Sequence, residues 1–231
     1  MKTGLIKAYV NIPGVKSFKY HGINSNCNKQ PDPDPLLYYE NNPPYGPEVE
    51  VIIKYKDIRM AYKKSYNYNT VWSATSGSLS YNVIGNVVNA SGRYYIYRYF
   101  MIYDTSVLPI NCLITKAIIK PYIGSLRESE PWCMQLQWGN GVYPHYPIVS
   151  GDYNQANYSG NYGQNTYWGI GLVPIELTSA GIGLINKLGL TKFALRNNNE
   201  INYLQPSGFQ DATIANGLQS LYFWITYRLP L

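Results

Sequence analysis

One run of residues constrains the fold of this chain more than any other feature. Residues 94–104, YYIYRYFMIYD, place Ile96, Phe100 and Ile102 on even positions, and tyrosines with Met101 on odd positions. Successive side chains of a β-strand point to opposite faces, so a strand with this pattern is apolar on both faces. Such strands are typical of sheets that are covered on both sides. The run therefore predicts a central strand in the core of an all-β domain.

Arg98 lies within this apolar run and needs a partner. A buried guanidinium must meet a carboxylate or several carbonyl groups, because an unpaired buried charge costs much free energy. Asp104, at the end of the same run, and Glu200, far along the chain, are the two candidate carboxylates. The sequence does not choose between them. We expect a structural buried charge that involves Arg98 with Asp104 or Glu200.

Further runs of alternating or β-branched residues predict additional strands. They lie at residues 48–58, 112–123, 132–138, 191–196 and 218–231. In the first of these runs, Val49, Val51 and Ile53 share one face. Pro121 indicates a sheet edge or a bulge, because proline cannot donate a ladder hydrogen bond. The single predicted helix covers residues 180–188, after Thr178 or Ser179 as N-cap.

The chain divides by composition into an N-terminal arm and a larger domain. Residues 1–47 combine a short predicted strand with a stretch rich in proline, which favours extended backbone. Within this arm the apolar side chains would be poorly placed in water, so we expect them to contact a partner: Leu36, Leu37, Tyr38 and Tyr39. Residues 48–231 are then expected to form the β-sandwich domain.

Composition argues against several functions. Only 14% of the residues are charged, and the net charge of +6 (pI near 9.0) is scattered rather than clustered, so no nucleic-acid partner is predicted. The chain has 2 histidines and no marked pair of carboxylates, so we expect no enzyme activity and no cofactor. Asp152 and Asp211 could supply oxygens to a structural Ca²⁺, but no metal-binding motif marks a site. Cys112 and Cys133 are expected to be free thiols, with one bridge between them left open.

Residues 1–18 carry no secretory signal, because a long apolar segment with a cleavage site is missing. No apolar run reaches the roughly 18 residues that a membrane-spanning helix needs, so no membrane span is predicted. We therefore expect synthesis in the cytosol. A place in a virion or another extracellular particle would then depend on release by lysis.

Aromatic side chains are dense in the second half of the chain. Residues 142–171 are rich in Tyr, Asn and Gly, and this polar, turn-dense stretch is predicted to be a surface loop rather than core. Rings beside amides suit glycan binding, contact with another protein, or packing within the loop, and all three explanations remain open. The candidate contact residues are Trp132, Trp138, Tyr143, Tyr146, Tyr153, Tyr158, Tyr162 and Trp168.

Several short motifs, in a fixed order, resemble a known family. Residues 93–109, RYYIYRYFMIYDTSVLP, and residues 114–123, ITKAIIKPYI, are similar to the signature of the disaggregatase-related repeat (DNRLRE-type) domains. The later TKFALRNNNEI and the closing SLYFWITYRLP resemble the C-terminal motifs of that family. The resemblance covers residues 70–229 and implies a non-catalytic, jelly-roll-like antiparallel β-sandwich of the carbohydrate-binding-module kind. Related domains occur in secreted polysaccharide-degrading proteins and in phage structural proteins.

Taken together, these features predict an all-β, jelly-roll-like antiparallel β-sandwich with an extended Pro-rich N-terminal arm. We expect a non-enzymatic structural protein of a phage-like virion or extracellular assembly, acting through self-association or contacts with other virion proteins. The alternative is a carbohydrate-binding module that recognises a polysaccharide or a cell-surface glycan.

Overall fold

The computed structural model describes residues 45–80, 82–165, 169–215 and 220–231. The chain divides at Asn42 into two units, and the second, Pro43–Leu231, contains every described residue. Of the N-terminal strand and Pro-rich arm predicted at residues 1–47, all but residues 45–47 lie outside the described residues. The same holds for the arm residues Leu36, Leu37, Tyr38 and Tyr39, and for Trp168.

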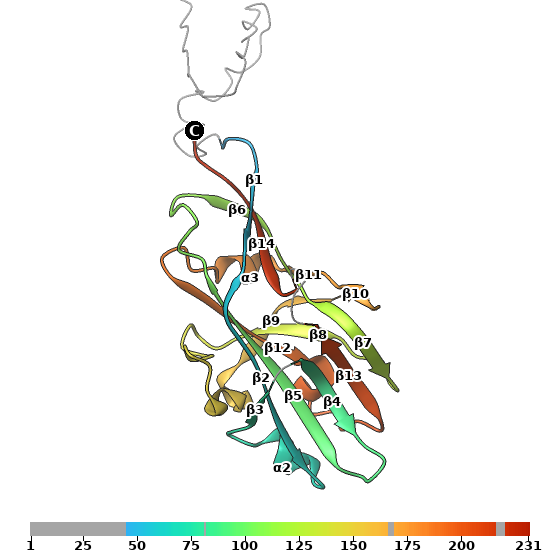
Figure 1. Ribbon diagram of the computed structural model, residues 1–231. Coiled ribbons are helices and arrows are strands. Elements are labelled where there is room, and N and C mark those ends of the chain that lie inside the picture. The colour runs from blue at the N-terminus through green and yellow to red at the C-terminus, as the bar shows by residue number, and fades with distance from the viewer. Residues whose placement is uncertain (1–44, 81, 166–168, 216–219) are drawn as a thin grey trace, which may run out of the picture. The chain divides into compact units, whose positions relative to one another are not determined.

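The described part of the chain consists mainly of β-strands (Figure 1). Every strand pair that the structure describes is antiparallel, which confirms the predicted all-β antiparallel fold. The strands are β1 (Val49–Ile53), β2 (Tyr55–Ser65), β3 (Ser78–Ser80), β4 (Val83–Val88), β5 (Tyr94–Asp104), β6 (Leu113–Lys120), β7 (Tyr122–Glu128), β8 (Met134–Trp138), β9 (Ser159–Gln164), β10 (Gly171–Leu172), β11 (Ile175–Leu177), β12 (Leu190–Asn197), β13 (Phe209–Ile214) and β14 (Tyr222–Arg228).

Short helical segments connect these strands. They are α2 (Tyr68–Trp72), η1 (Ser150–Tyr153), η2 (Gln155–Asn157), α3 (Ser179–Gly183) and α4 (Asn198–Ile201). The predicted helix at residues 180–188 forms only as α3, although Thr178 does cap it by accepting a hydrogen bond from the amide of Gly181. Two glycines within this helix explain its short length, because glycine costs about 1 kcal/mol in a helix interior.

β5 is the strand around which the sheet is organised. One edge of β5 pairs along its length with β2. On the other edge, residues 99–104 pair with β12 and residues 94–97 pair with β4, so the sheet forks beside Arg98. One branch continues from β12 through β8, β9, β11, β6 and β14 to β1, and the other continues from β4 through β13 and β7 to β10.

The two branches are linked by strands that pass from one to the other. Pro121 separates β6, in the first branch, from β7, in the second, so a single stretch of chain crosses between them (Figure 1). The predicted sheet edge or bulge at this proline is therefore replaced by a crossover, in which proline costs no ladder hydrogen bond because it lies between two strands. Lys54 separates β1, at the end of the first branch, from β2, which pairs with β5 and β3. The result is a curled antiparallel sheet that encloses a core in the manner of a β-sandwich.

The two faces of β5 pack into two different hydrophobic cores. Tyr99, Met101 and Tyr103 belong to the main core, which also contains apolar residues of both branches. Ile96, Phe100 and Ile102 belong to a second core on the opposite face. The prediction that this strand is covered on both sides is confirmed.

The second core is covered by loops rather than by another sheet. Ile148, Tyr153 and Tyr158 are buried there, together with Tyr68 and Val71 of α2. The prediction that residues 142–171 are too polar for the core is therefore wrong for the first part of this stretch. The buried aromatic rings of this stretch face the sheet, and its asparagines and glycines form the turns that position these rings.

The close approach of β4 and β13 gives a test of this architecture. A Cβ atom on Gly85 would collide with the backbone of Gln210 and Asp211. We expect Gly85→Ala to lower the free energy of unfolding by about 1–3 kcal/mol, as overpacking does in other cores. Urea denaturation measures this change. Gly151→Ala is the matched control, because a Cβ atom there meets nothing within 4 Å; equal effects of the two variants would contradict the described packing.

Candidate functional site: buried charges and an apolar end

The most strongly coupled polar groups form a cluster at the fork of the sheet. Glu200 of α4 accepts hydrogen bonds through Oε1 from Arg98 Nη2 at 2.5 Å and from Arg196 Nη2 at 2.6 Å. Arg196 Nε donates to Oε2 of the same carboxylate at 2.9 Å. All three side chains are buried. The cluster thus joins β5, β12 and α4.

The remaining guanidinium donors of this buried charge cluster meet other oxygens. Arg98 donates to the backbone carbonyls of Trp72 and Tyr153, and its guanidinium lies 4.2 Å from the centre of the Tyr153 ring. Arg196 Nη1 donates to Gln137 Oε1 at 2.5 Å. Glu200 supplies one negative charge to two guanidinium groups, so the remaining donors of Arg98 and Arg196 bind neutral oxygens. This arrangement is that of a structural network, in which the donors are directed inward and bound.

Electrostatics hold Glu200 in its ionised form. Burial alone would raise the pKa of this carboxyl, but the charges of Arg196 and Arg98 together hold the pKa below its usual value. Burial also lowers the pKa of the Arg196 guanidinium, with Arg98 adding to that effect. Of the two carboxylates considered from the sequence, Glu200 is the one that meets Arg98.

Asp104 is not part of the buried charge cluster, which corrects its expected role. Its side chain is 40% exposed and accepts from Lys56 Nζ at 3.0 Å and from Ser106 Oγ at 2.6 Å. These two contacts lower the pKa of the Asp104 carboxyl. Because Asp104 ends β5 six residues after Arg98, an extended strand holds the two side chains roughly 20 Å apart.

The aromatic side chains predicted to contact a glycan or a partner do not form one surface. Trp132, Tyr153 and Tyr158 are buried, so their expected role as contact residues is wrong. They pack inside because the apolar faces of the sheet need large rings to cover them.

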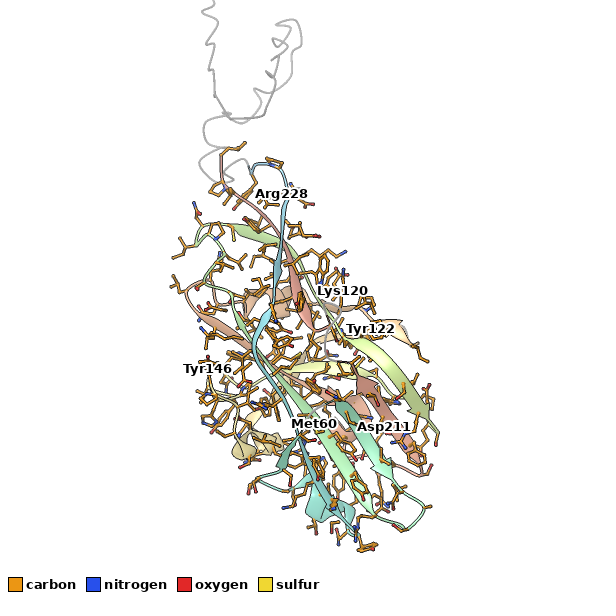
Figure 2. All side chains as sticks on the ribbon, in the orientation of Figure 1. Met60, Lys120, Tyr122, Tyr146, Asp211 and Arg228 are labelled. Carbon is orange, nitrogen blue, oxygen red and sulfur yellow. The ribbon has the colours of Figure 1, made fainter. Side chains whose placement is uncertain are left out.

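The other predicted aromatic residues are only partly accessible. Trp138 packs edge-on against Tyr162 at 6.4 Å between ring centres, and both are half-buried. Tyr143 packs against Tyr158 at 6.3 Å and is also half-buried. Tyr146 is 50% exposed and lies 5.5 Å from Lys56 Nζ. In the view of Figure 2 it lies at the left of the molecule, apart from Asp211 at the right.

The two aspartates considered for Ca²⁺ have their oxygens engaged by protein donors. Asp152 is fully buried and accepts from the His145 backbone amide at 3.0 Å, from His145 Nδ1 at 2.7 Å and from the Val149 amide at 2.8 Å. Asp211 accepts from Arg127 at 2.5 and 3.0 Å. Within the described residues no group of three or more His, Cys, Asp or Glu side chains could hold a metal ion. Cys112 and Cys133 are free thiols.

Exposed aliphatic side chains lie on two loops, one between β5 and β6 and one before β12. Val107, Ile110 and Leu188 are 65%, 63% and 76% exposed, and Leu113 is exposed beside them in sequence. We call these four residues the apolar end. The loop before β6 is fixed to the loop before β12, because the Thr105 amide donates to the Gly189 carbonyl at 3.0 Å and Lys187 Nζ donates to the Cys112 carbonyl at 2.8 Å.

The apolar end has the character of a contact surface. Single exposed apolar residues are common on proteins, whereas several on two joined loops are the kind of surface that contact sites share. Lys187 adds a cation whose amine is already fixed by a backbone carbonyl. The sequence analysis did not single out this site. Its one signal was the sequence VLPINCL, which holds more apolar residues than Leu108 and Cys112, the two that the main core buries.

A row of tyrosines is a second surface that the sequence analysis missed. Tyr95 and Tyr97 on β5 stack at 6.0 Å with 9° between ring planes, and Tyr62 on β2 lies 5.7 Å from Tyr97. We call these three residues the tyrosine row. All three are half-buried, and burial, followed by the charge of nearby Asp211, raises the pKa of Tyr97 to about 12. The signal was available in the odd positions of residues 94–104, and Tyr62 and Tyr97 also pack against the main core.

Comparison with known proteins finds no family model that matches this chain and no curated protein with significant similarity to it. Among the described residues, no helix is long and apolar enough to cross a membrane.

The buried charge cluster yields a stability prediction with a pH dependence. Glu200→Gln leaves two buried guanidinium groups without a carboxylate, so we expect a loss of about 3–5 kcal/mol in the free energy of unfolding at pH 7. Because the folded pKa of Glu200 is lowered, its contribution is present above the unfolded pKa of about 4.3 and is lost as pH falls through the folded value. The difference between wild type and variant in urea denaturation should therefore shrink in acid.

Asp104→Asn is the matched control for this prediction. It removes the carboxylate of an exposed ion pair, which contributes little to stability in water. A Glu200→Gln variant that unfolds at the same urea concentration as Asp104→Asn would show that the cluster does not hold the fork together.

Proposed function

We propose that this chain is a non-enzymatic structural subunit of a phage-like virion or another extracellular assembly, joined to it by protein–protein contacts. The observation that carries the proposal is the apolar end, whose exposed Val107, Ile110 and Leu188 are held on two loops that hydrogen bond to each other. Burying apolar surface is the dominant favourable contribution in most protein association. The Pro-rich arm, with Leu36, Leu37, Tyr38 and Tyr39, is proposed as a second contact.

The use of charge inside the domain supports a structural role. Arg98 and Arg196 each donate to Glu200 and to further inward-facing oxygens. His145 is held through Nδ1 by Asp152, whose carboxylate also binds two backbone amides and so fixes a loop. These are arrangements that brace a scaffold. The resemblance to the DNRLRE-type domains, which include phage structural proteins, adds to the proposal and stays a prediction.

Glycan binding is the second candidate, and the tyrosine row favours it. Flat rings in a row on a sheet match the apolar C–H faces of successive sugar units. Arg127, held by Asp211 and lying 4.3 Å from the Phe209 ring, supplies hydrogen-bond donors from the neighbouring strands. The partial burial of these rings leaves a smaller platform than the apolar end, so we place this function second.

The assembly proposal is tested by charging the apolar end. The triple variant Val107→Asp, Ile110→Asp, Leu188→Asp should keep the wild-type unfolding midpoint, because these side chains are exposed, and should lose association with the particle. The measurement is co-sedimentation of the full chain with particles released from the producing cells. The matched control changes Leu79, Ile170 and Leu204, three exposed aliphatic residues elsewhere, to Asp. If both triple variants co-sediment like wild type, the apolar end is not the contact.

The glycan proposal is tested at the tyrosine row. Tyr95→Ala and Tyr97→Ala should each weaken binding to a glycan identified on an array at least about tenfold, because stacking of an aromatic ring supplies part of the contact. Tyr146→Ala, at an exposed tyrosine outside the row, should bind normally. An array without any bound glycan would exclude this second function.

A further inference from the structure

β1 has an edge that the described part of the chain leaves open. In residues 45–80, 82–165, 169–215 and 220–231, β1 pairs with β14 and with no other strand. An open edge presents unpaired amide and carbonyl groups that can pair with another strand. Four of its five residues are β-branched, and Val49 and Ile52 are exposed although β-branched residues favour covered sheets.

The outward face of β1 continues an apolar row of the sheet. Ile52 lies opposite Trp224 of β14, and Trp224 lies opposite Ile118 of β6. Lys120 Nζ lies 3.9 Å from the centre of the Trp224 ring and covers part of it. The row therefore ends at the open edge with Ile52, which is 42% exposed. The opposite face of β1 turns toward the main core, where Ile53 is buried and Val51 packs.

The charges of β1 and of Lys54, the residue directly after it, are arranged so that this segment complements itself. Exposed Glu50 precedes Ile52 by two residues, and exposed Lys54 follows it by two. In an antiparallel pair of two such strands with Ile52 opposite Ile52, each Glu50 lies opposite a Lys54 on the same face. The apolar row would then run unbroken across both copies, and on the other face Val51 would lie opposite Ile53.

Other registers lose this match. Moving the centre of the pair to Val51 places Ile52 opposite Glu50, and moving it to Ile53 places Ile52 opposite Lys54. Centring it on Glu50 brings two carboxylates together, which is destabilising. A single register therefore satisfies the apolar and the charged positions at once, which is what specifies strand pairing.

We propose that two copies of this chain form a two-fold dimer by antiparallel pairing of their β1 edges, with Ile52 at the centre. The partner is thus a second copy of the same chain, in an isologous contact that uses the same residues on both sides. The inference rests on the proposed structural function, because it names the repeating unit from which such an assembly would be built. It uses the β1 edge, which is separate from the apolar end.

Sedimentation velocity of the full chain over a range of concentrations tests the dimer. Wild type should show a reversible monomer–dimer equilibrium. Ile52→Lys should raise the dissociation constant at least about tenfold, since it places two ammonium groups opposite each other at the centre. Val149→Lys is the matched control, because Val149 is 41% exposed and lies in the loop before η1 rather than on β1. It should dimerise like wild type.

A charge exchange tests the register. Glu50→Lys and Lys54→Glu should each weaken the dimer about tenfold, because each variant turns two attractive pairs into repulsive ones. The double variant Glu50→Lys, Lys54→Glu restores opposite charges across the two-fold axis and should dimerise within about threefold of wild type. Unchanged association in the single variants, or no recovery in the double variant, would overturn the proposed register.

Two further results would separate this inference from the proposed function. A wild-type monomer at all concentrations overturns the dimer, and protection of the β1 amides from hydrogen exchange in that monomer would show that another segment of the same chain occupies the edge. If such a monomer still co-sediments with particles, the structural function remains. If the dimer forms and the chain never co-sediments with particles, the structural function fails and the dimer remains.

Discussion

The pairing of one buried carboxylate with two buried guanidinium groups is the interaction on which the rest of this structure depends. Arg98 lies where β5 changes its neighbour from β12 to β4, so the strands beside it diverge and leave backbone that needs support. Glu200 reaches this point from α4 and binds both Arg98 and Arg196. Arg98 then holds the covering segments through the carbonyls of Trp72 and Tyr153. A small number of charge-assisted hydrogen bonds thus connects the fork of the sheet to its cover.

The forked sheet explains why a domain of this size has two hydrophobic cores. The branches enclose the main core, and the outward face of β2, β5 and β12 would be left in water without a cover. α2 and the tyrosine-rich segment that includes η1 and η2 supply that cover. Aromatic residues are efficient for this purpose because each ring buries a large area from a single backbone position. Most tyrosines of this segment pack against the sheet, so the candidate contact surfaces lie elsewhere.

The two surfaces proposed for association with protein are the apolar end and the β1 edge. The apolar end offers aliphatic side chains on loops that are tied together, and the β1 edge offers backbone groups flanked by complementary charges. Use of both would allow one chain to contact a second copy and a larger particle at the same time. If the second candidate function holds, the tyrosine row would bind the glycan at residues separate from both of these surfaces.

The sequence by itself determined the features that depend on the alternation of neighbouring residues. The two apolar faces of β5 and the division of β1 into an inner and an outer face follow from local pattern, because side-chain direction repeats every two residues in a strand. The sequence also predicted a helix cap at Thr178 or Ser179, and the structure has it at Thr178. Only the tertiary structure decided between Asp104 and Glu200, since the chosen partner is 102 residues from Arg98. It also decided which rings of residues 142–158 point inward, because that depends on a fork in a sheet built from distant strands. Local periodicity predicts which face of a strand a side chain points to. Its partner depends on which distant segment of the chain packs against that face.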